Sequence, residues 1–407
     1  MQKFIFKEYQ KGFAKSIFWC KVVQFSGYRV VPVKKLRENM KVNFNRAALQ
    51  EALNLVTMIV PSRTPKPILR CLRITADKDS VRIGATDLEL GITYRIAQVQ
   101  VEQTGEAVVP ADRLAAIVRE SIDEVVSFEA TESACHLKGA DSHFTIYAND
   151  PGQFPAIPEY DGKPSLEIEL SKLQVGVEQT LFATARESTR YAINGVLWEL
   201  HGKKLTLVAT DGRRLARCKV DVIGTPDAEL SGKRIIVPAK TMALLDKVGG
   251  GDKDKAAVKF VDNQVIMACA NVVISSNLVE GSFPKYEDII PTDYTNRIAL
   301  NTEAVLSAVK RAALLTNEDS KGIKLAIGKN VVVFSSRAPE TGDAQIDMSI
   351  EYGNEPIEIG FNPAFLVDVL RVMKSKEFEL ELGQPDRPGL FKSGPNFLYV
   401  VMPINLG

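Results

Sequence analysis

The sequence predicts an α+β fold of three similar domains, each assembled from two halves of the order β-α-β-β-β. The first observation is a hairpin-like segment that recurs along the chain. Thr86 and Thr210 stand 124 residues apart in it, and Thr210 and Ser336 stand 126 residues apart. The second is that short alternating apolar runs, typical of half-buried strands, outnumber the helical patterns. Short strands that follow one another in sequence favour antiparallel sheets, so we expect three copies of one largely antiparallel unit.

The best copy of the recurring segment is Lys204–Ala216, which reads K-L-T-L-V-A-T-D-G-R-R-L-A. Alternating runs flank Asp211-Gly212, and this pattern predicts a two-residue hairpin turn, in which both central residues take a positive φ. Weaker copies occupy Ser80–Leu90 and Asn330–Arg337. The three copies define the period of the repeat.

The first repeat begins with a predicted strand at Lys41–Phe44. Asn45 is the expected N-cap of a helix over Arg46–Val60, whose apolar spacing is amphipathic. The elements expected after it are strands Ile68–Thr75, Val81–Ala85, Leu90–Val99 and Glu106–Val109, helix Ala111–Glu120, and strands Glu124–Glu129, Ser133–Lys138 and His143–Ala148.

The second and third repeats follow the same order. Ser171 is the expected N-cap of a helix that runs to Thr184. The other expected elements are strands Leu166–Leu170, Gly195–Leu200, Leu205–Ala209, Leu215–Val220, Arg234–Ala239 and Ile298–Asn301, helix Thr302–Thr316, strands Gly322–Ile327, Val331–Ser335, Ala344–Glu351 and Pro356–Phe361, helix Pro363–Lys374, and strands Phe378–Leu382, Gly389–Lys392 and Leu398–Met402.

Matching landmarks set the domain boundaries. Val109-Pro110-Ala111 corresponds to Val237-Pro238-Ala239, and Gly152–Pro155 corresponds to Gly281–Pro284. These matches predict domains at residues 40–164, 165–291 and 297–407, with an extension at 1–39 that is outside the repeat and poorly ordered. Open sheet edges tend to continue from one unit to the next, and closed curvature would give a ring with helices on one surface and sheet on the other.

The extension concentrates positive charge. The whole chain has 51 basic and 50 acidic residues, whereas residues 1–39 contain nine Lys/Arg and two Glu. The remainder from Met40 onward therefore has 42 basic and 48 acidic residues, a net charge of −6. An acidic body excludes a protein that coats nucleic acid over its whole surface. We interpret the extension as an upstream addition without function, with Met40 as the original start; a basic arm that contacts nucleic acid is the alternative.

The composition excludes several classes of protein. Hydrophobic residues make up 45% and no apolar run approaches the ~20 residues of a membrane-spanning helix, so no membrane association is expected. The five cysteines are scattered and never in CxxC spacing, which indicates reduced thiols in a cytoplasmic protein. His136 and His143 flank a predicted hairpin without further ligands, and the Gly249-Gly250-Gly251 loop lacks the P-loop pattern. We therefore expect no catalytic residue, metal or cofactor.

Cations recur on equivalent predicted helices of this acidic body, outside their apolar arcs. They are Arg113 and Arg119, Lys172, Lys240 and Lys247, Lys310 and Arg311, and Arg371 and Lys374. Singly, each is typical of a solvated helix face. Together, they would give a ring lining that attracts phosphates without reading bases.

Several specific motifs extend the comparison beyond periodicity. They are V-A-T-D-G-R-R-L-A at Val208–Ala216, T-R-Y-A-I-N-G at Thr189–Gly195, L-V-E-G-S-F-P-K-Y at Leu278–Tyr286, N-E-D-S-K-G-I at Asn317–Ile323, I-G-F-N-P at Ile359–Pro363 and Y-V-V-M-P-I at Tyr399–Ile404. From Met40 to Leu406 the chain resembles the bacterial DNA polymerase III beta subunit, the sliding clamp family. The resemblance covers about nine tenths of the chain.

The resemblance implies the DNA clamp fold, with each chain a crescent that forms half of a ring, helices inside and antiparallel sheets outside. It implies a non-catalytic processivity factor of the replicative DNA polymerase. Two copies join head to tail, encircle duplex DNA without sequence preference and slide on it. The implied partners are the polymerase catalytic subunit, the clamp loader, and other replication and repair proteins that carry a clamp-binding peptide.

The resemblance also implies site residues by matched position. The partner-peptide groove would consist of Arg190, Ile193, Thr210, Gly212, Arg213, Arg214, Leu215, Pro284, Ile289, Asn362, Phe365, Val400, Val401, Met402, Pro403 and Ile404. The apolar C-terminal run, with a methionine suited to a groove that accepts several ligands, agrees with this; a plain last strand is the alternative. Arg213, Asp288 and Asn405 depart from the residues common in the family, so the polar edge of the groove and its preferred peptide stay open.

Two further sets follow from matched positions. The subunit contact would join Phe144 and Ile146 of one copy to Leu314 and Leu315 of the other, although the leucines are also compatible with ordinary core. Arg63 and Tyr191 match positions that touch DNA, and the DNA-facing set adds helix cations, which are Arg113, Lys240, Lys247, Lys310, Arg311, Arg371 and Lys374. The alternative function is a β-rich modular interaction protein that does not encircle DNA; a hydrolase is a third reading.

Overall fold

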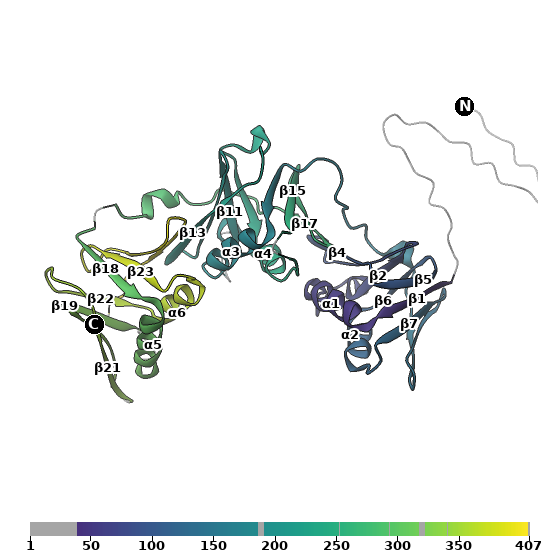
Figure 1. Ribbon diagram of the computed structural model, residues 1–407, viewed down its shortest axis with the longest axis horizontal. Helices are drawn as coiled ribbons and strands as arrows, with labels where there is room; N and C mark the ends of the chain where they lie inside the picture. Colours follow the sequence, from purple (N-terminus) through teal and green to yellow (C-terminus); the bar gives the residue numbers. More distant parts are fainter. Residues whose placement is uncertain are drawn as a thin grey trace, which may run out of the picture. The chain divides into compact units, whose positions relative to one another are not determined.

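The computed structural model describes residues 39–185, 191–251, 253–292, 294–316, 322–339 and 341–405. All of these belong to one compact unit, Glu38–Gly407. Apart from Asn39, the predicted extension is outside the described residues. The predicted α+β fold of three similar repeats is confirmed (Figure 1).

Each repeat contributes two helices. They are α1 (Arg46–Val56), α2 (Ala111–Glu120), α3 (Leu170–Leu181), α4 (Ala239–Asp246), α5 (Thr302–Ala312) and α6 (Pro363–Val372). The predicted cap Asn45 accepts a hydrogen bond from the backbone N–H of Ala48. Asn301, expected only as the last residue of a strand, caps α5 by accepting from the N–H of Ala304. The longest described helix has 12 residues, and none has the length and apolarity needed to span a bilayer.

The strands of the three repeats fall into matching sets. Repeat I has β1 (Met40–Asn45), β2 (Cys71–Ala76), β3 (Val81–Thr86), β4 (Leu90–Ile96), β5 (Val99–Gln103), β6 (Gly105–Pro110), β7 (Val125–Ala130), β8 (Ala134–Lys138) and β9 (His143–Tyr147). Repeat II has β10 (Leu166–Glu169), β11 (Gly195–His201), β12 (Lys204–Thr210), β13 (Arg214–Asp221), β14 (Arg234–Pro238), β15 (Lys255–Val261), β16 (Gln264–Cys269) and β17 (Val272–Asn277). Repeat III has β18 (Asn296–Asn301), β19 (Ile323–Gly328), β20 (Val331–Ala338), β21 (Gly342–Ser349), β22 (Ile357–Phe361), β23 (Glu377–Leu382), β24 (Gly389–Ser393) and β25 (Phe397–Val401).

Three local predictions are wrong. Ser171 is not a cap, because α3 begins one residue earlier and its first N–H donates to the carbonyl of Asp254 instead of to a side chain. The run Leu90–Val99 is not one strand, since β4 and β5 belong to different sheets. The turn after Thr210 is longer than two residues: Thr210 pairs with Leu215, and of the two predicted positive-φ residues only Gly212 has one, at 88°.

The two halves of every repeat exchange their first strands. In repeat I, β1 pairs with β7 of the second half, whereas β6 pairs with β2 of the first half. Repeats II and III do the same, with β10 on β15, β14 on β11, β18 on β23 and β22 on β19. Neither half can therefore complete its own sheet, and each repeat is a single folding unit.

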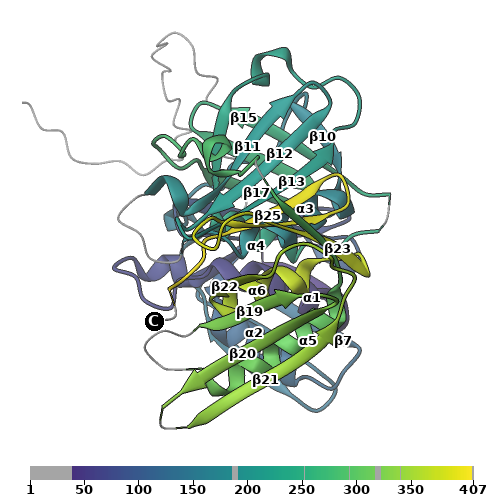
Figure 2. The same ribbon diagram turned by 90° about the vertical axis from the view of Figure 1, so that its left-hand side faces the viewer.

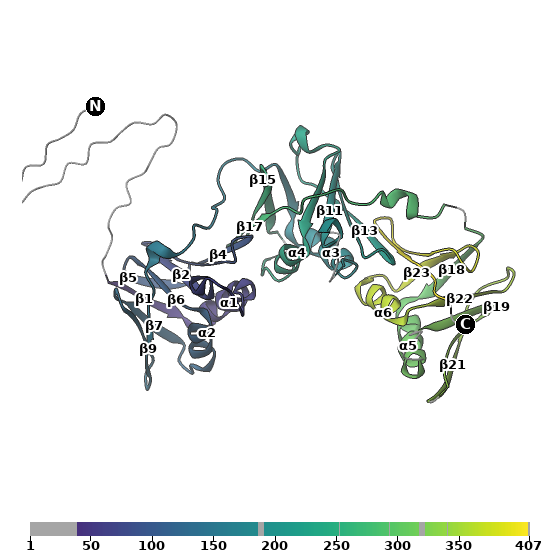
Figure 3. The ribbon, with the colours of Figure 1, turned by 180° about the vertical axis from the view of Figure 1, so that it is seen from behind.

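Sheets also continue from one repeat to the next. Strand β4 pairs antiparallel with β17, which joins repeats I and II (Figure 1). Strand β13 pairs antiparallel with β25, which joins repeats II and III (Figure 2). Both junctions join the last strand of the β-α-β-β-β order of a first half to the last strand of a second half. The remaining strands of these two kinds, β21 and β9, lie at free sheet edges (Figure 3). The predicted continuation of sheets between units is thus confirmed.

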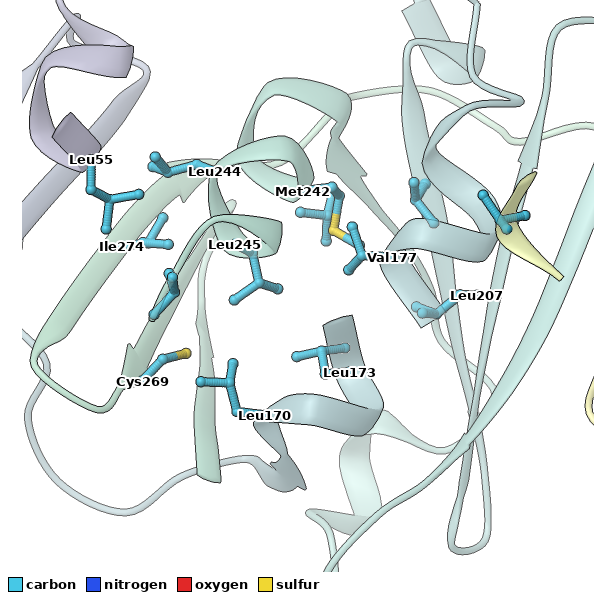
Figure 4. Packing of buried hydrophobic residues seen from close by; sticks show 14 of the residues in the cluster. Leu55, Leu170, Leu173, Val177, Leu207, Met242, Leu244, Leu245, Cys269 and Ile274 are labelled. Carbon is cyan, nitrogen blue, oxygen red and sulfur yellow. The ribbon is translucent and has the colours of Figure 1, made fainter. Parts of the chain in front are cut away.

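The helices pack in pairs, α1 with α2, α3 with α4 and α5 with α6, on one side of the sheets (Figure 1). One apolar core runs through all three repeats. Around α3 and α4, Leu173, Val177 and Met242 face one another, while Leu55 of α1 lies beside Leu244 of α4 (Figure 4). Burial of apolar side chains on this helix side of the sheets stabilises the fold, and the opposite side carries separate, smaller clusters.

Candidate functional site

A second apolar cluster lies at the junction of repeats II and III, on the sheet face away from the helices. Leu215 of β13 and Val400 of β25 stand directly opposite each other at its centre. We call it the outer cluster, and its residues are Leu197, Val208, Leu215, Ile236, Phe283, Tyr286, Leu390, Leu398 and Val400. Alternation along the strands separates it from the main core: Val400 belongs to the outer cluster, and its neighbours Tyr399 and Val401 belong to the core.

Partly buried apolar side chains pack against the outer cluster, namely Ala192, Val279, Ile290 and Tyr294. Met402, close in sequence to Val400, and Ile289, adjacent to Ile290, are each 39% exposed, whereas Ile193 is buried. Tyr286 fixes the linker side of the border, because its hydroxyl donates to Glu199 Oε2 at 2.6 Å. Burial, followed by the hydrogen bond to Glu199, raises the pKa of Tyr286 far above its usual value, so this hydroxyl stays protonated. The arrangement is a hydrophobic floor with partly exposed apolar walls.

The turn between β12 and β13 forms one wall. Asp211 Oδ1 accepts hydrogen bonds from the N–H groups of Arg213 and Arg214, and Thr210 Oγ1 donates to the Arg214 carbonyl. The carbonyl of Arg213 in turn accepts from the N–H of Met402 at 2.9 Å. The turn therefore holds the start of the C-terminal tail beside the outer cluster.

Arg214 points away from this cluster and joins two repeats on the helix side. Its guanidinium donates to Asp211 at 3.0 Å, to Asp368 of α6 at 2.8 Å and to the carbonyl of Phe182 at 2.7 Å. It also lies over the Phe365 ring, 4.4 Å from the centroid. Burial opposes its charge, but the hydrogen bond to Asp368 and the neighbouring charges raise the pKa of Arg214 above its usual value. Arg214 is a structural link and not a groove-lining side chain.

The C-terminal tail lines a second hollow. The N–H of Ile404 donates to the carbonyl of Gly360 at 2.9 Å, which places the tail along β22. A cleft of about 480 Å³ lies next to it, lined by Lys324, Glu358, Ile359, Gly360, Pro385, Asp386, Pro403, Ile404 and Asn405. Of the predicted groove residues, Pro403 and Ile404 belong to this cleft.

The structure brings together part of the predicted groove set. Leu215, Val400, Met402, Ile289 and Pro284 are on or beside the outer cluster. Val401 faces the core, and Asn362 is the N-cap of α6, accepting from the N–H of Ala364. Arg190 is outside the described residues. The divergent positions Arg213, Asp288 and Asn405 are all exposed, so they can alter the polar border without changing the floor.

The sequence analysis missed most of the floor. Leu197, Val208, Ile236, Leu390 and Leu398 each alternate with core residues along their strands, and that pattern alone marks them as facing the other side of a sheet. Apolar residues occupy consecutive positions in these strands, which indicates that both faces of the sheet are covered. The sequence analysis did not use this signal. A strand with two apolar faces at a repeat boundary was the available signal.

The predicted DNA-facing cations are all exposed on helices or in loops. These are Arg63, Arg113, Lys240, Lys247, Lys310, Arg311, Arg371 and Lys374; Arg119 and Lys172 are exposed as well. The side chain of Tyr191 is outside the described set. Because all six helices lie on one side of the sheets, the helix cations share that side of the molecule (Figure 3).

Carboxylates partly neutralise this surface. Lys240 pairs with Asp87 of the neighbouring repeat, and Lys374 pairs with Glu178 at 2.7 Å. Lys247 lies 2.7 Å from Asp246, and a hydrogen bond to that carboxylate, followed by its charge, raises the pKa of Lys247. Exposed pairs of this kind are weak and exchange with solvent ions. The cations on the helix side therefore remain available to a polyanion at the cost of breaking weak pairs.

Two sheet edges carry the predicted subunit contact. On β9, Phe144 is 41% exposed and Ile146 is buried at the edge of the core. Leu314, in the turn after α5, is 79% exposed, and Leu315 is half-buried. This turn packs against β21, the other free edge. Exposed apolar groups thus accompany the free edges of β9 and β21, and such edges are ready to pair.

The side chains that could bind a metal ion are dispersed over the described residues. They contain no group of three or more His, Cys, Asp and Glu side chains placed to hold a metal ion. Burial raises the pKa of both Cys135 and Cys269 to about 12, so neither thiol ionises near neutrality. Cys71 and Cys218 are also buried and free, and Cys20 is outside the described residues.

Family models match along nearly the whole repeat region. The N-terminal domain of the DNA polymerase III beta subunit matches residues 40–158, the central domain matches 167–285, and the C-terminal domain matches 287–405. The three matches occur in the order in which the repeats follow one another.

Related proteins and structures cover the same region. The beta sliding clamp of Pseudomonas putida is 29% identical over 370 residues, covering 90% of this chain and 100% of the relative, and that of Chlamydia pneumoniae is 28% identical over 369 residues, covering 90% and 99%. The crystal structure of a Pseudomonas aeruginosa sliding clamp bound to griselimycin superposes with a TM-score of 0.83 at 29% identity, covering 91% of this chain and 100% of that one. The Bacillus subtilis sliding clamp gives a TM-score of 0.84 at 25% identity, with the same coverage.

Proposed function

The chain belongs to the DNA polymerase III beta subunit family, and we propose from this membership that it acts as a beta sliding clamp, the processivity factor of a replicative DNA polymerase. Its work is topological and non-catalytic. A ring that encloses duplex DNA keeps the polymerase bound to it near the template, and raises the local concentration of that enzyme as any tether does. We assign the three clamp domains to residues 40–164, 165–291 and 297–407.

The observation that supports a closed ring is the repeated junction. Strands β4 and β17, and then β13 and β25, join consecutive repeats by the same kind of antiparallel pairing. One strand of each kind has a free edge at the end of its sheet, β21 in repeat III and β9 in repeat I. Pairing β21 of one copy with β9 of a second copy repeats the junction, and a two-fold pair of such contacts closes a homodimer of six repeats. Phe144, Ile146, Leu314 and Leu315 would accompany these edges.

The helix side of the sheets would face DNA. Its exposed cations can contact phosphates without reading base edges, which gives sequence-independent, salt-sensitive binding that permits sliding. Arg63 and the cations of α2, α4, α5 and α6 are the proposed contacts, with Tyr191 added from its matched position. The acidic partners Asp87, Glu178 and Asp246 keep these contacts weak.

The outer cluster would hold the polymerase and other partners. An apolar peptide laid over Leu215 and Val400, between Met402 and Ile289, would bury exposed apolar surface on both molecules. We include Arg190, Ile193, Arg213 and Pro284 from the matched positions as its border. The clamp loader and other replication and repair proteins with such a peptide would compete for it. A protein working on chromosomal DNA would be cytoplasmic and nucleoid-associated.

Retention on circular DNA tests the ring. The protein is loaded onto nicked circular plasmid by its clamp loader and separated from free protein by gel filtration in 0.15 M salt. We expect it to stay with the circle and to be lost, at least tenfold, after the plasmid is linearised, because a ring slides off a free end. A parallel sample keeps the circle intact through the same steps.

The same experiment separates the alternative function. A modular interaction protein that binds the side of DNA would leave circular and linear molecules at equal rates. Equal loss from both would therefore overturn the clamp proposal, while retention on the linear form would indicate ordinary binding.

A further inference from the structure

One line of directly opposite residues crosses the outer cluster from β14 to β24. In strand order it consists of Ile236, Leu197, Val208, Arg217, Leu398 and Lys392. All except the arginine and the lysine belong to the apolar floor. Arg217 stands between Val208 and Leu398, and it shares its face of β13 with Leu215, two residues before it. A cation is thus built into the floor on which a partner peptide would lie.

The first junction has no charge at this place. Leu215 corresponds to Gly91, because each pairs with the matched threonine at the end of the preceding strand. Two residues later, Arg217 corresponds to Thr93. The cation therefore accompanies the junction whose apolar floor is open, and it is missing from the junction whose glycines Ile157 covers.

The guanidinium of Arg217 is not satisfied within the chain. Its Nε is buried and has no hydrogen-bond partner among the described residues. Burial lowers the pKa of Arg217, and the nearby Tyr286 and Glu287 only partly offset this effect. Glu287 is exposed, and the arginine with which it pairs, at 3.9 Å, is Arg234. The side chain of Arg217 as a whole is half-buried, so a ligand can reach it.

Other cations beside the floor already have carboxylate partners. Arg234 lies 3.1 Å from the buried Glu199, and Lys392 lies 2.7 Å from the buried Glu381. Such pairs offset the free-energy cost of burial, since a desolvated charge is stable only beside an opposite one. Arg217 lacks such a close partner in the described part of the chain.

We propose that Arg217 makes the groove selective for peptides that carry one aspartate or glutamate, because its guanidinium receives that carboxylate when the apolar part of the peptide lies over Leu215 and Val400. The inference rests on the proposed partner groove. A guanidinium and a carboxylate form two parallel, charge-assisted hydrogen bonds. The bound peptide also excludes water from the pair, which strengthens the attraction between opposite charges. Binding therefore supplies the partner that the fold leaves out.

The strand geometry gives the spacing of the acidic residue. Leu215 and Arg217 are two residues apart on β13, which is about 7 Å along an extended strand. An extended peptide also advances about 7 Å in two residues and returns its side chains to the same face. The carboxylate is therefore expected two positions from the apolar residue that covers Leu215, in either direction of the peptide.

The surroundings favour one carboxylate over an acidic run. Glu287 and Asp288 are exposed on the linker beside Tyr286 of the outer cluster. They would repel any further negative charge, so an acidic tail would gain at Arg217 and lose at these two residues. The expected partner is a mainly apolar peptide with a single acidic side chain.

Selection from a random library tests the preference. Dodecapeptides displayed on phage are selected on the full chain, and the recovered peptides are synthesised with a fluorescent label. Those whose affinity falls in the Met402→Ala variant, measured by fluorescence anisotropy, are the ones bound at the outer cluster. We expect an aspartate or glutamate two positions from an apolar residue to be enriched among them at least threefold over the unselected library.

Paired substitutions in peptide and protein measure the contact. Replacing the acid of the peptide by its amide should weaken binding to the wild-type chain about 10- to 100-fold, the range of a hydrogen bond to a charged group. In Arg217→Gln the same replacement should change the affinity less than threefold, and Arg217→Lys should restore part of the preference. Lys219→Gln is the matched control, because Lys219 is the next residue on this face of β13 and lies outside the floor; it should keep the full preference.

Thermal unfolding separates recognition from a structural role. Arg217→Leu extends the apolar floor and removes a desolvated cation, so the midpoint of unfolding should stay equal or rise. A fall in the midpoint, together with an unaltered peptide preference in Arg217→Gln, would assign Arg217 to the fold alone and overturn the proposal.

The outcomes separate this inference from the proposed function. Outer-cluster peptides without acidic enrichment, or an equal loss on the acid-to-amide change in wild type and Arg217→Gln, would overturn the role of Arg217 and leave the groove intact. Failure to recover any peptide that depends on Met402 would overturn the groove together with this inference. Retention on circular DNA would still decide the clamp independently.

Discussion

The junction of repeats I and II and the junction of repeats II and III have the same strand topology but opposite surfaces. At the first, Gly84 and Gly91 lie beneath Ile157 of the linker, and a Cβ added to Gly84 would approach Ile157 Cδ1 to 2.6 Å. At the second, the matched positions hold Val208 and Leu215, which form the floor of the outer cluster. The chain itself fills the first junction, whereas apolar side chains remain partly exposed around the second.

The difference indicates why only one junction would bind a partner. A peptide over Gly84 and Gly91 would have to displace Ile157 and would find no side chain beneath it to pack against. A peptide over Leu215 and Val400 would meet a preformed apolar floor, which avoids the free-energy cost of reorganising the site. The same fold element thus serves as a plain joint in one place and as a candidate binding site in the other.

The largest expected effect comes from breaking the helix-side link of the second junction. Arg214→Ala removes the guanidinium donor to Asp211, Asp368 and the Phe182 carbonyl. Asp211 keeps its backbone N–H donors, whereas Asp368 and the Phe182 carbonyl lose this partner. We expect a loss of about 3 kcal/mol in the free energy of unfolding, since removing one member of a buried ion pair is strongly destabilising. Urea denaturation followed by circular dichroism measures it.

Lys240→Ala is the matched variant at the first junction. Its pair with Asp87 also joins two repeats, but the lysine is exposed, so the loss should stay below about 1 kcal/mol. Equal effects of the two substitutions would contradict the view that the second junction depends on a buried charge network.

Removal of the C-terminal tail tests whether the second junction binds a peptide on its outer face. Truncation after Val401 deletes one wall of the outer cluster and should weaken binding of an apolar clamp-binding peptide by at least 100-fold, while the dimer stays intact. Met402→Ala should lose about tenfold, because this side chain is an exposed apolar wall. Fluorescence anisotropy of a labelled peptide measures both, and Ile122→Ala, a more exposed residue of repeat I, is the control. Unchanged peptide affinity after truncation would dismiss this groove.

Adding a side chain at Gly91 of the first junction, where the second junction has Leu215, should lower the free energy of unfolding. A Cβ at Gly91 would lie 2.7 Å from Ser275 Oγ and 2.9 Å from Ile157 Cγ2, so Gly91→Ala overpacks the joint and should destabilise the chain by about 1–2 kcal/mol. Adding Ile157→Ala removes one of the two close contacts. The double variant should therefore lose less than the sum of the single changes in a double-mutant cycle. Strict additivity would show that Ile157 does not fill the space above Gly91.

Local signals predicted the elements well where their cause was local. Asn45 caps its helix as expected, and α2 has the predicted bounds Ala111–Glu120. Ser171 failed because the first N–H of α3 finds the carbonyl of Asp254, a partner more than eighty residues away. The prediction of one strand over Leu90–Val99 failed for a similar reason, since β5 is defined by its pairing with the distant strand β1.

The candidate site was less predictable than the fold. Matched positions placed Leu215, Val400 and Met402 at the groove, but they also included Arg214 and Val401, which face the helices. Strand alternation fixes which residues share a face, yet it does not tell which face is outward when both are apolar. Which face is outward depends on where α3 packs against the strands, and this packing is known only from the folded repeat.

The smallest expected change in stability comes from the two turns that precede β4 and β13, the strands that pair across the junctions. Leu88 and Gly212 occupy the same place after the matched Thr86 and Thr210, with φ angles of 82° and 88°. This left-handed region costs a leucine about 1 kcal/mol and glycine nearly nothing. Because Leu88 is about half exposed, Leu88→Gly loses little burial and should raise the free energy of unfolding by up to about 1 kcal/mol, although glycine also gains freedom in the unfolded chain. Gly212→Ala should lower it by a similar amount, since nothing lies within 4 Å of the added methyl and only the backbone strain remains. If Leu88→Gly destabilised the chain instead, the leucine side chain would have to contribute more than its strained backbone costs, and the two turns would not be equivalent.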